Sequence, residues 1–181
     1  MDSLDLSFRF EPSDDAAEFS GYAVIWGERN AHNEIVQRGA FAKTLAGHRA
    51  AGTKPVMFWS HNRDDIIGVW EEIREDEKGL FVRGRLLKEI SRGREVHEMM
   101  KAGAVNGLSI GFRVPPGGEE RRNGVRHIRQ IDLAEISVVG LPSAGRARIT
   151  SVRSSGRSVE SAAAFIEACR KASCALITKG K

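Results

Sequence analysis

Residues 107–114 have the sequence GLSIGFRV, in which apolar side chains alternate with small or polar ones. A period of two is typical of a β-strand that buries one of its faces. The alternation places Leu108 and Ile110 on one face and leaves Ser109 on the other, between two glycines. The hydroxyl group of Ser109 is therefore accessible to a partner or a substrate, although an ordinary strand serine beside a bulge glycine gives the same pattern.

Six more runs of β-branched and aromatic residues flank this stretch, at 19–26, 55–60, 66–73, 79–87, 124–131 and 133–141. Turn-forming residues bound most of them, as expected for strands. Two segments, 38–49 and 89–103, have apolar residues at helical spacing instead. The Pro/Gly-rich segment 115–122 is expected to form an exposed hairpin loop. Together these elements predict a β-rich fold with a few helices, built as a closed barrel or a sandwich.

The charge of the 181-residue chain divides it into a domain and a tail. Residues 1–150 hold 22 basic and 22 acidic residues, whereas residues 151–181 hold six basic and two acidic ones. The tail therefore carries the whole net charge of +4. It begins as a Ser/Arg/Gly-rich linker and continues as an Ala-rich stretch at 159–177 with helical spacing.

The composition argues against several classes of function. No apolar run reaches the roughly 18 to 20 residues that a membrane helix needs, so no membrane partner is expected. The neutral domain and the aromatic content of 7% argue against specific nucleic-acid binding. Cys169 and Cys174 fit neither a zinc knuckle nor a redox CxxC, and they are expected to be reduced thiols. His97 and Glu98 lack the second histidine of an HExxH motif, so neither a metal nor a cofactor is expected.

Two residues have the chemistry that a nucleophilic serine requires. His61 ends an apolar run and precedes the polar turn 62–65, where it can be held rigidly as a general base or can simply bond to its own turn. Glu135 interrupts the apolar run 131–139 and therefore needs a histidine or a cation as partner. The structural alternative for Glu135 is a salt bridge to one of three arginines, Arg83, Arg85 or Arg129.

The order of the three candidates is unusual. The sequence His61, Ser109, Glu135 differs from the orders of the chymotrypsin, subtilisin and α/β-hydrolase triads, and no GxSxG elbow is present. A serine enzyme with this order must use a different scaffold.

Several short motifs, in this order, resemble the HK97-type prohead (capsid maturation) serine proteases of tailed bacteriophages, which are related to the herpesvirus assembly proteases. The resemblance covers most of residues 17–150 and rests on GYAVIWGERN, EIVQRGAFAKTL, PVMFWSHNRDDIIG, GLSIGF and AEISVVGLPS. It implies a closed β-barrel flanked by helices, with Ser109 as nucleophile, His61 as base and Glu135 as the third triad member. Asp132 is the rival for the third position, but it lies on the opposite strand face. The resemblance also implies that the arginine-bearing segment 145–148 corresponds to a loop that, in the herpesvirus relatives, helps to stabilise the oxyanion.

The resemblance also implies a substrate and a place of action. The enzyme would cleave the scaffolding segment of the major capsid protein, or a separate scaffold, and also itself. It would act without a cofactor inside assembling proheads, in the cytoplasm of the host bacterium, and a homo-oligomer is a possible assembly. The tail would be self-cleaved or would bind scaffold. The alternatives are a non-catalytic capsid-assembly module that binds scaffold through its tail, and a small β-barrel that binds nucleic acid.

Overall fold

A seven-stranded sheet forms most of the structure. The computed structural model describes residues 17–152. The strands of this sheet are β1 (Glu18–Ile25), β3 (Val56–Trp59), β4 (Asn62–Glu75), β5 (Gly79–Leu86), β6 (Gly107–Arg113), β9 (Asp132–Val139) and β10 (Ile149–Val152). They are arranged in the order β10-β1-β5-β4-β3-β9-β6, and all neighbours are antiparallel except the parallel pair β3 and β9. The prediction of a β-rich fold with helices is confirmed.

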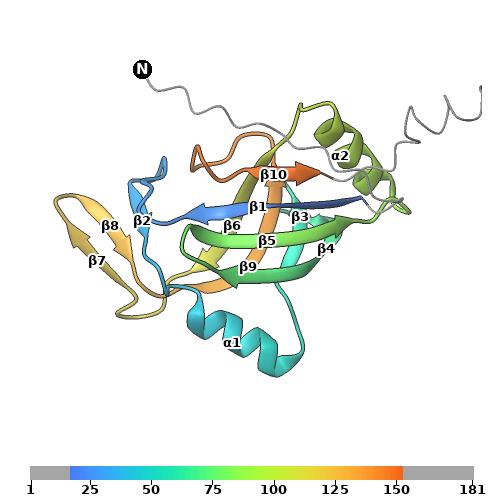
Figure 1. Cartoon of the computed structure of the whole chain (residues 1–181). Coiled ribbons are helices and arrows are strands. Elements are labelled where there is room, and N and C mark those ends of the chain that lie inside the picture. Colours follow the sequence, from blue (N-terminus) through green and yellow to red (C-terminus); the bar gives the residue numbers. More distant parts are fainter. Residues whose placement is uncertain (1–16, 153–181) are drawn as a thin grey trace, which may run out of the picture.

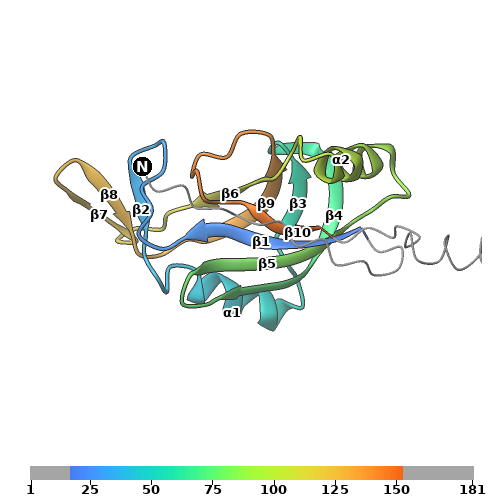
Figure 2. The same ribbon diagram turned by 45° about the horizontal axis from the view of Figure 1, so that its top comes forward.

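The sheet curls into a half-barrel, so the prediction of a closed barrel was wrong (Figures 1 and 2). The two edge strands approach each other at a single bridge between Gly107 and Arg148. There the Leu108 N–H donates to the Ala147 carbonyl at 2.9 Å, and the Ile149 N–H donates to the Asn106 carbonyl at 2.8 Å. Apart from this bridge, β6 and the four-residue strand β10 do not pair in the described part of the chain, so the sheet stays open.

Two helices pack on the sheet and bury a common core. The helix α1 (Ala42–Ala51) contacts β9 and β4, and α2 (Ser91–Lys101) contacts β4 and β5. They lie on opposite sides of the sheet, α1 below and α2 above in both ribbon views (Figures 1 and 2). The period-two pattern of β5 buries Leu80, Val82 and Leu86 on one face of the strand. The helical spacing of α2 buries Val96 and Met100 on one face of the helix.

The first helix begins later than the sequence pattern predicts. The expected helix covers 38–49, but α1 starts at Ala42 because Gly39 has a φ of +91° and interrupts the helical path. The N–H of Phe41 donates to Glu75 Oε1 at 2.9 Å and so is satisfied by a strand rather than by a helix.

A second sheet has three strands, and one of them lies in the segment 115–122 that was expected to be a hairpin loop. Its strands are β2 (Glu34–Val36), β7 (Glu119–Arg122) and β8 (Val125–Ile128), in the order β2-β8-β7. The hairpin turn is formed by Asn123 and Gly124, which both have positive φ and match the Asn-Gly signature of a type I′ turn. The segment 115–122 was expected to be an exposed hairpin loop. Residues 115–118 do form a turn, whereas Glu119–Arg122 form β7, whose hairpin with β8 projects at the left of Figure 1.

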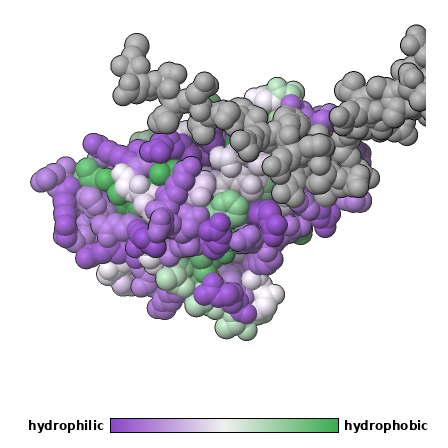
Figure 3. Space-filling model, in the orientation of Figure 1, coloured by the Kyte–Doolittle hydropathy of each residue, from purple (hydrophilic) through white to green (hydrophobic). Residues whose placement is uncertain are grey.

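The face shown in Figure 3 is largely hydrophilic, with scattered apolar areas. Within residues 17–152, no helix is long and apolar enough to span a membrane. The same residues contain no cluster of three or more His, Cys, Asp or Glu side chains that is suited to a metal ion. The predicted tail helix at 159–177 and its two cysteines lie outside the described residues.

Candidate active site

The order of strands in the large sheet brings Ser109, His61 and Glu135 together. Ser109 lies on β6, Glu135 lies on β9, and His61 lies in the turn between β3 and β4. Strand β9 runs between the other two, and its Ser137 is in register with Ser109 on one side and with Phe58 on the other. Residues that are 48 and 74 positions apart in the sequence are therefore neighbours in space.

The three side chains form one continuous chain of hydrogen bonds. His61 Nε2 lies 2.9 Å from Ser109 Oγ, and His61 Nδ1 lies 2.5 Å from Glu135 Oε1. An ionised carboxylate only accepts hydrogen bonds, so Nδ1 carries the proton and Nε2 is left to accept the hydroxyl proton of Ser109. This arrangement can deprotonate the serine and hold the resulting imidazolium against a carboxylate.

His61 is held by an unusual turn. The residues Trp59 and Asn62 pair across the β3–β4 hairpin, so Ser60 and His61 form a two-residue turn. Their φ values are +50° and +63°, a left-handed conformation that costs energy in residues other than glycine. Two main-chain bonds fix the turn on β9, because the Ser60 N–H donates to the Val138 carbonyl at 2.9 Å and the His61 N–H to Ser137 Oγ at 3.3 Å.

Glu135 is buried and both of its oxygens are engaged. Its side chain is 10% exposed, compared with 45% for the His61 side chain, and Ser137 Oγ donates to Glu135 Oε2 at 2.5 Å. In the described part of the chain, Glu135 has no ion pair with an arginine; Arg83 lies instead near Glu71 and Glu72, and Arg129 near Glu120. Asp132, the rival third residue, is exposed and in register with Arg113, away from His61.

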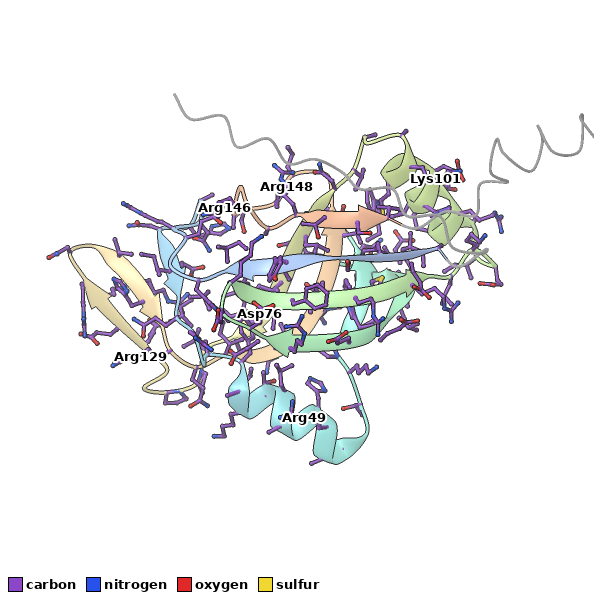
Figure 4. All side chains as sticks on the ribbon, viewed as in Figure 1. Arg49, Asp76, Lys101, Arg129, Arg146 and Arg148 are labelled. Atoms are coloured by element: carbon purple, nitrogen blue, oxygen red, sulfur yellow. The ribbon has the colours of Figure 1, made fainter. Side chains whose placement is uncertain are left out.

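Ser109 and His61 open into a cleft of about 360 Å³. Its other walls come from the end of β1, the β1–β2 connection and the loop between β9 and β10, which contributes Leu141, Ser143, Ala144 and Ala147. Arg146 and Arg148 lie on this loop, just before β10 in the chain (Figure 4). The Arg148 guanidinium donates to Asn106 Oδ1 at 2.8 Å and to the Gly145 carbonyl at 2.9 Å, whereas the main-chain N–H of Arg146 donates to Glu28. A role for either arginine at the oxyanion remains a prediction.

Comparison with known proteins assigns the chain to a family. A model of the caudovirus prohead serine protease family matches residues 5–162. The chain belongs to this family. The family expected from the short motifs is thus confirmed.

Individual members and a solved structure agree with this assignment. The prohead protease of Enterobacteria phage HK97 is 33% identical over 138 residues, which cover 75% of this chain and 60% of that protein. The capsid polyprotein of Pseudomonas phage PAJU2 is 32% identical over 110 residues, which cover 57% of this chain and 16% of that protein. The bacteriophage T4 capsid assembly protease, gp21, shares the fold, with a TM-score of 0.55 and 11% identity over 69% of this chain and 82% of that one.

Two further residues support the candidate triad in ways that were not predicted from the sequence. Ser137 shares a strand face with Glu135 by its period-two spacing, and that spacing was the available signal. Gly111 was interpreted as leaving room around the Ser109 hydroxyl. The structure gives it a different role, because Gly111 is in register with Glu135 and the carboxylate lies over it.

Replacing Gly111 with alanine is expected to lower proteolytic activity by about 100-fold without removing any triad residue. A Cβ atom at this position would lie 2.2 Å from Glu135 Oε1 and 2.9 Å from its Cγ, so the carboxylate must move away from His61. The check is kcat/KM together with the melting temperature. Gly47→Ala, in α1, is the control, because a Cβ there meets nothing within 4 Å. Full activity of Gly111→Ala would contradict a role for this contact.

Proposed function

We propose that the chain is a serine endopeptidase in which Ser109 is the nucleophile, His61 the general base and Glu135 the residue that orients His61. The observation that carries the proposal is the unbroken series of hydrogen bonds from buried Glu135 through His61 to Ser109, at the wall of a cleft. Membership of a serine protease family supports the same reaction class.

The reaction follows from the positions of the protons. Ser109 Oγ attacks the scissile carbonyl carbon while its proton moves to His61 Nε2. The tetrahedral intermediate collapses as the C–N bond breaks, and His61 gives the proton to the leaving amine. A water molecule then attacks the acyl group in the same way, again with His61 as base, and Ser109 regains its proton. Glu135 keeps the Nδ1 proton in place and stabilises the imidazolium during both steps.

We propose the scaffolding segment of a phage major capsid protein, or a separate scaffold, as the substrate, together with the chain's own tail. Two relatives named as a prohead protease and a capsid polyprotein support this choice. The site of action would be the assembling prohead in the host bacterial cytoplasm. The alternative of a non-catalytic capsid-assembly module offers no explanation for a buried carboxylate that is hydrogen-bonded to a histidine beside a serine.

The test is to incubate the purified chain with the major capsid protein of the same phage and to follow the intact masses of both over time. We expect the capsid protein to lose an N-terminal segment and the chain to lose pieces of its tail. A serine-reactive phosphonate should block both changes and add its mass to the peptide that contains Ser109. If both proteins stay whole under conditions in which proheads assemble, the assembly-module alternative replaces the protease.

A further inference from the structure

The cleft beside Ser109 has an uneven charge. Two carboxylates, Glu28 and Glu34, line it, and no lysine or arginine of the described residues does so. Both carboxylates belong to the segment that connects β1 to β2 and continues into β2. The two carboxylates differ in whether a cation lies beside them and balances their negative charge.

Glu34 is fully compensated. Its Oε1 pairs with the Arg126 guanidinium at 2.5 Å, and its Oε2 accepts a hydrogen bond from Asn30 Nδ2 at 3.0 Å. The hydrogen bond from Arg126 to Glu119, with a further contribution from Glu34, raises the pKa of Arg126 against the effect of burial, so this cation stays charged. Glu34 thus has no unused oxygen to offer a ligand, and it already has a cation beside it.

Glu28 is not compensated. Its Oε1 accepts the main-chain N–H of Arg146 at 3.0 Å, which fixes the carboxylate against the β9–β10 loop. Its Oε2 is buried and has no hydrogen-bond partner within residues 17–152, and Glu28 forms no ion pair there. A buried acceptor without a donor is costly, and a charged one more so. A ligand that supplies a donor and a positive charge at this point would remove both costs.

We propose that Glu28 forms a subsite that binds a lysine or arginine side chain of the peptide substrate close to the scissile bond. This inference rests on the proposed endopeptidase function. A cationic side chain in the cleft would make a charge-assisted hydrogen bond with the Glu28 carboxylate, the stronger kind of hydrogen bond in proteins. The size of the cleft places this side chain within a few residues of Ser109, because a cavity of about 360 Å³ holds only a small-molecule-sized part of a peptide.

The first step of the test identifies the preference of the wild-type chain. A library of peptides of mixed sequence is digested, and the cut sites are read by mass spectrometry. Lysine and arginine should be enriched at one position near the cut. A pair of peptides is then made that differ only there, with lysine in one and norleucine in the other. We expect kcat/KM of the wild type to be about 10- to 100-fold higher for lysine.

The second step is the substitution Glu28→Gln, which keeps the Oε1 acceptor for Arg146 and removes the charge. It should bring the lysine-to-norleucine ratio close to one, through a larger loss of rate on the lysine peptide than on the norleucine peptide. Glu89→Gln is the matched control, since Glu89 is exposed, precedes α2 and does not line the cleft. It should keep the wild-type ratio. Melting temperatures of both variants exclude a general loss of folding.

Two results would overturn the subsite while leaving the protease intact. One is a wild-type library without enrichment of basic residues. The other is an equal loss of rate by Glu28→Gln on both peptides, which would show that Oε2 binds the substrate main chain instead. Failure of the proposed function has a different signature, because then Ser109→Ala would cut the library as fast as the wild type.

Discussion

Replacing Ser109 with alanine is expected to abolish cleavage, with a fall in kcat/KM of about 10⁴-fold or more. The variant keeps His61 and Glu135 but has no oxygen to form the acyl intermediate. Ser109 is partly exposed on an edge strand, so its hydroxyl contributes little to the core, and the melting temperature should stay within a few degrees of the wild type. The measurement is the initial rate of cleavage of the capsid substrate, with thermal unfolding recorded in parallel.

A serine outside the cleft provides the control for this substitution. Ser20 lies on β1, in register with Ser151 and Arg83, and does not line the cleft. Ser20→Ala should therefore retain full activity. If Ser109→Ala cleaves the substrate at a rate comparable to the wild type, Ser109 is not the nucleophile and the proposed mechanism is wrong.

The substitution Glu135→Gln is expected to have the second largest effect, a fall in kcat of about 10⁴-fold with little change in KM. A glutamine amide can donate a hydrogen bond to His61 Nδ1, and this stabilises the tautomer that carries its proton on Nε2. That tautomer cannot accept the Ser109 proton. Because Glu135 Oε1 lies 2.5 Å from His61 Nδ1, the tautomer of His61 depends directly on whether residue 135 is a glutamate or a glutamine.

The tautomer itself can be observed. Nitrogen NMR shifts of labelled His61 distinguish a proton on Nδ1 from one on Nε2. A purely structural role for Glu135 would not predict a change of tautomer in Glu135→Gln. Asp132→Asn is the control, because Asp132 is exposed at the start of the same strand and should leave rate and tautomer unchanged. An active Glu135→Gln enzyme with an inactive Asp132→Asn enzyme would reverse the assignment of the third residue.

The local pattern of the sequence predicted much of the structure around the candidate site. The alternation around Ser109 gave a strand with the serine opposite Leu108, and the apolar run around Glu135 gave the strand that became β9. Both predictions depend only on neighbours within a few residues, for which period two is a sufficient guide. The cost of burying a lone carboxylate also predicted that Glu135 needs a partner.

The meeting of the three residues depended on information that no single segment contains. The strand order puts β9 between β3 and β6, and the parallel pairing of β3 with β9 sets the register that brings Glu135 to His61. Only the resemblance to a known family connected these residues in the sequence. Barrel closure was likewise a long-range property, because it depends on whether β6 and β10, at the two ends of the strand order, pair with each other.

The turn at His61 was missed for a local reason. The polar segment Asn62–Asp65 has the composition of a loop, so a turn was expected there, but these residues already belong to β4. The chain reverses one step earlier, at Ser60 and His61, which are poor candidates for a type I′ turn because neither is glycine, asparagine or aspartate. Contacts of this turn with β9 override the local preference, which makes the strain a consequence of tertiary structure.

The central place of β9 in the sheet sets when the enzyme can become active during its synthesis. Among the strands of residues 17–152, β9 is the second-last, yet it separates β3, which leads into the turn with the base, from β6, which carries the nucleophile of the proposed triad. A nascent polypeptide that has emerged only as far as β8 contains Ser109 and His61 but has nothing to hold them side by side. Under the proposed mechanism, competence for proteolysis is therefore expected only after β9 has been synthesised and has paired with β3 and β6.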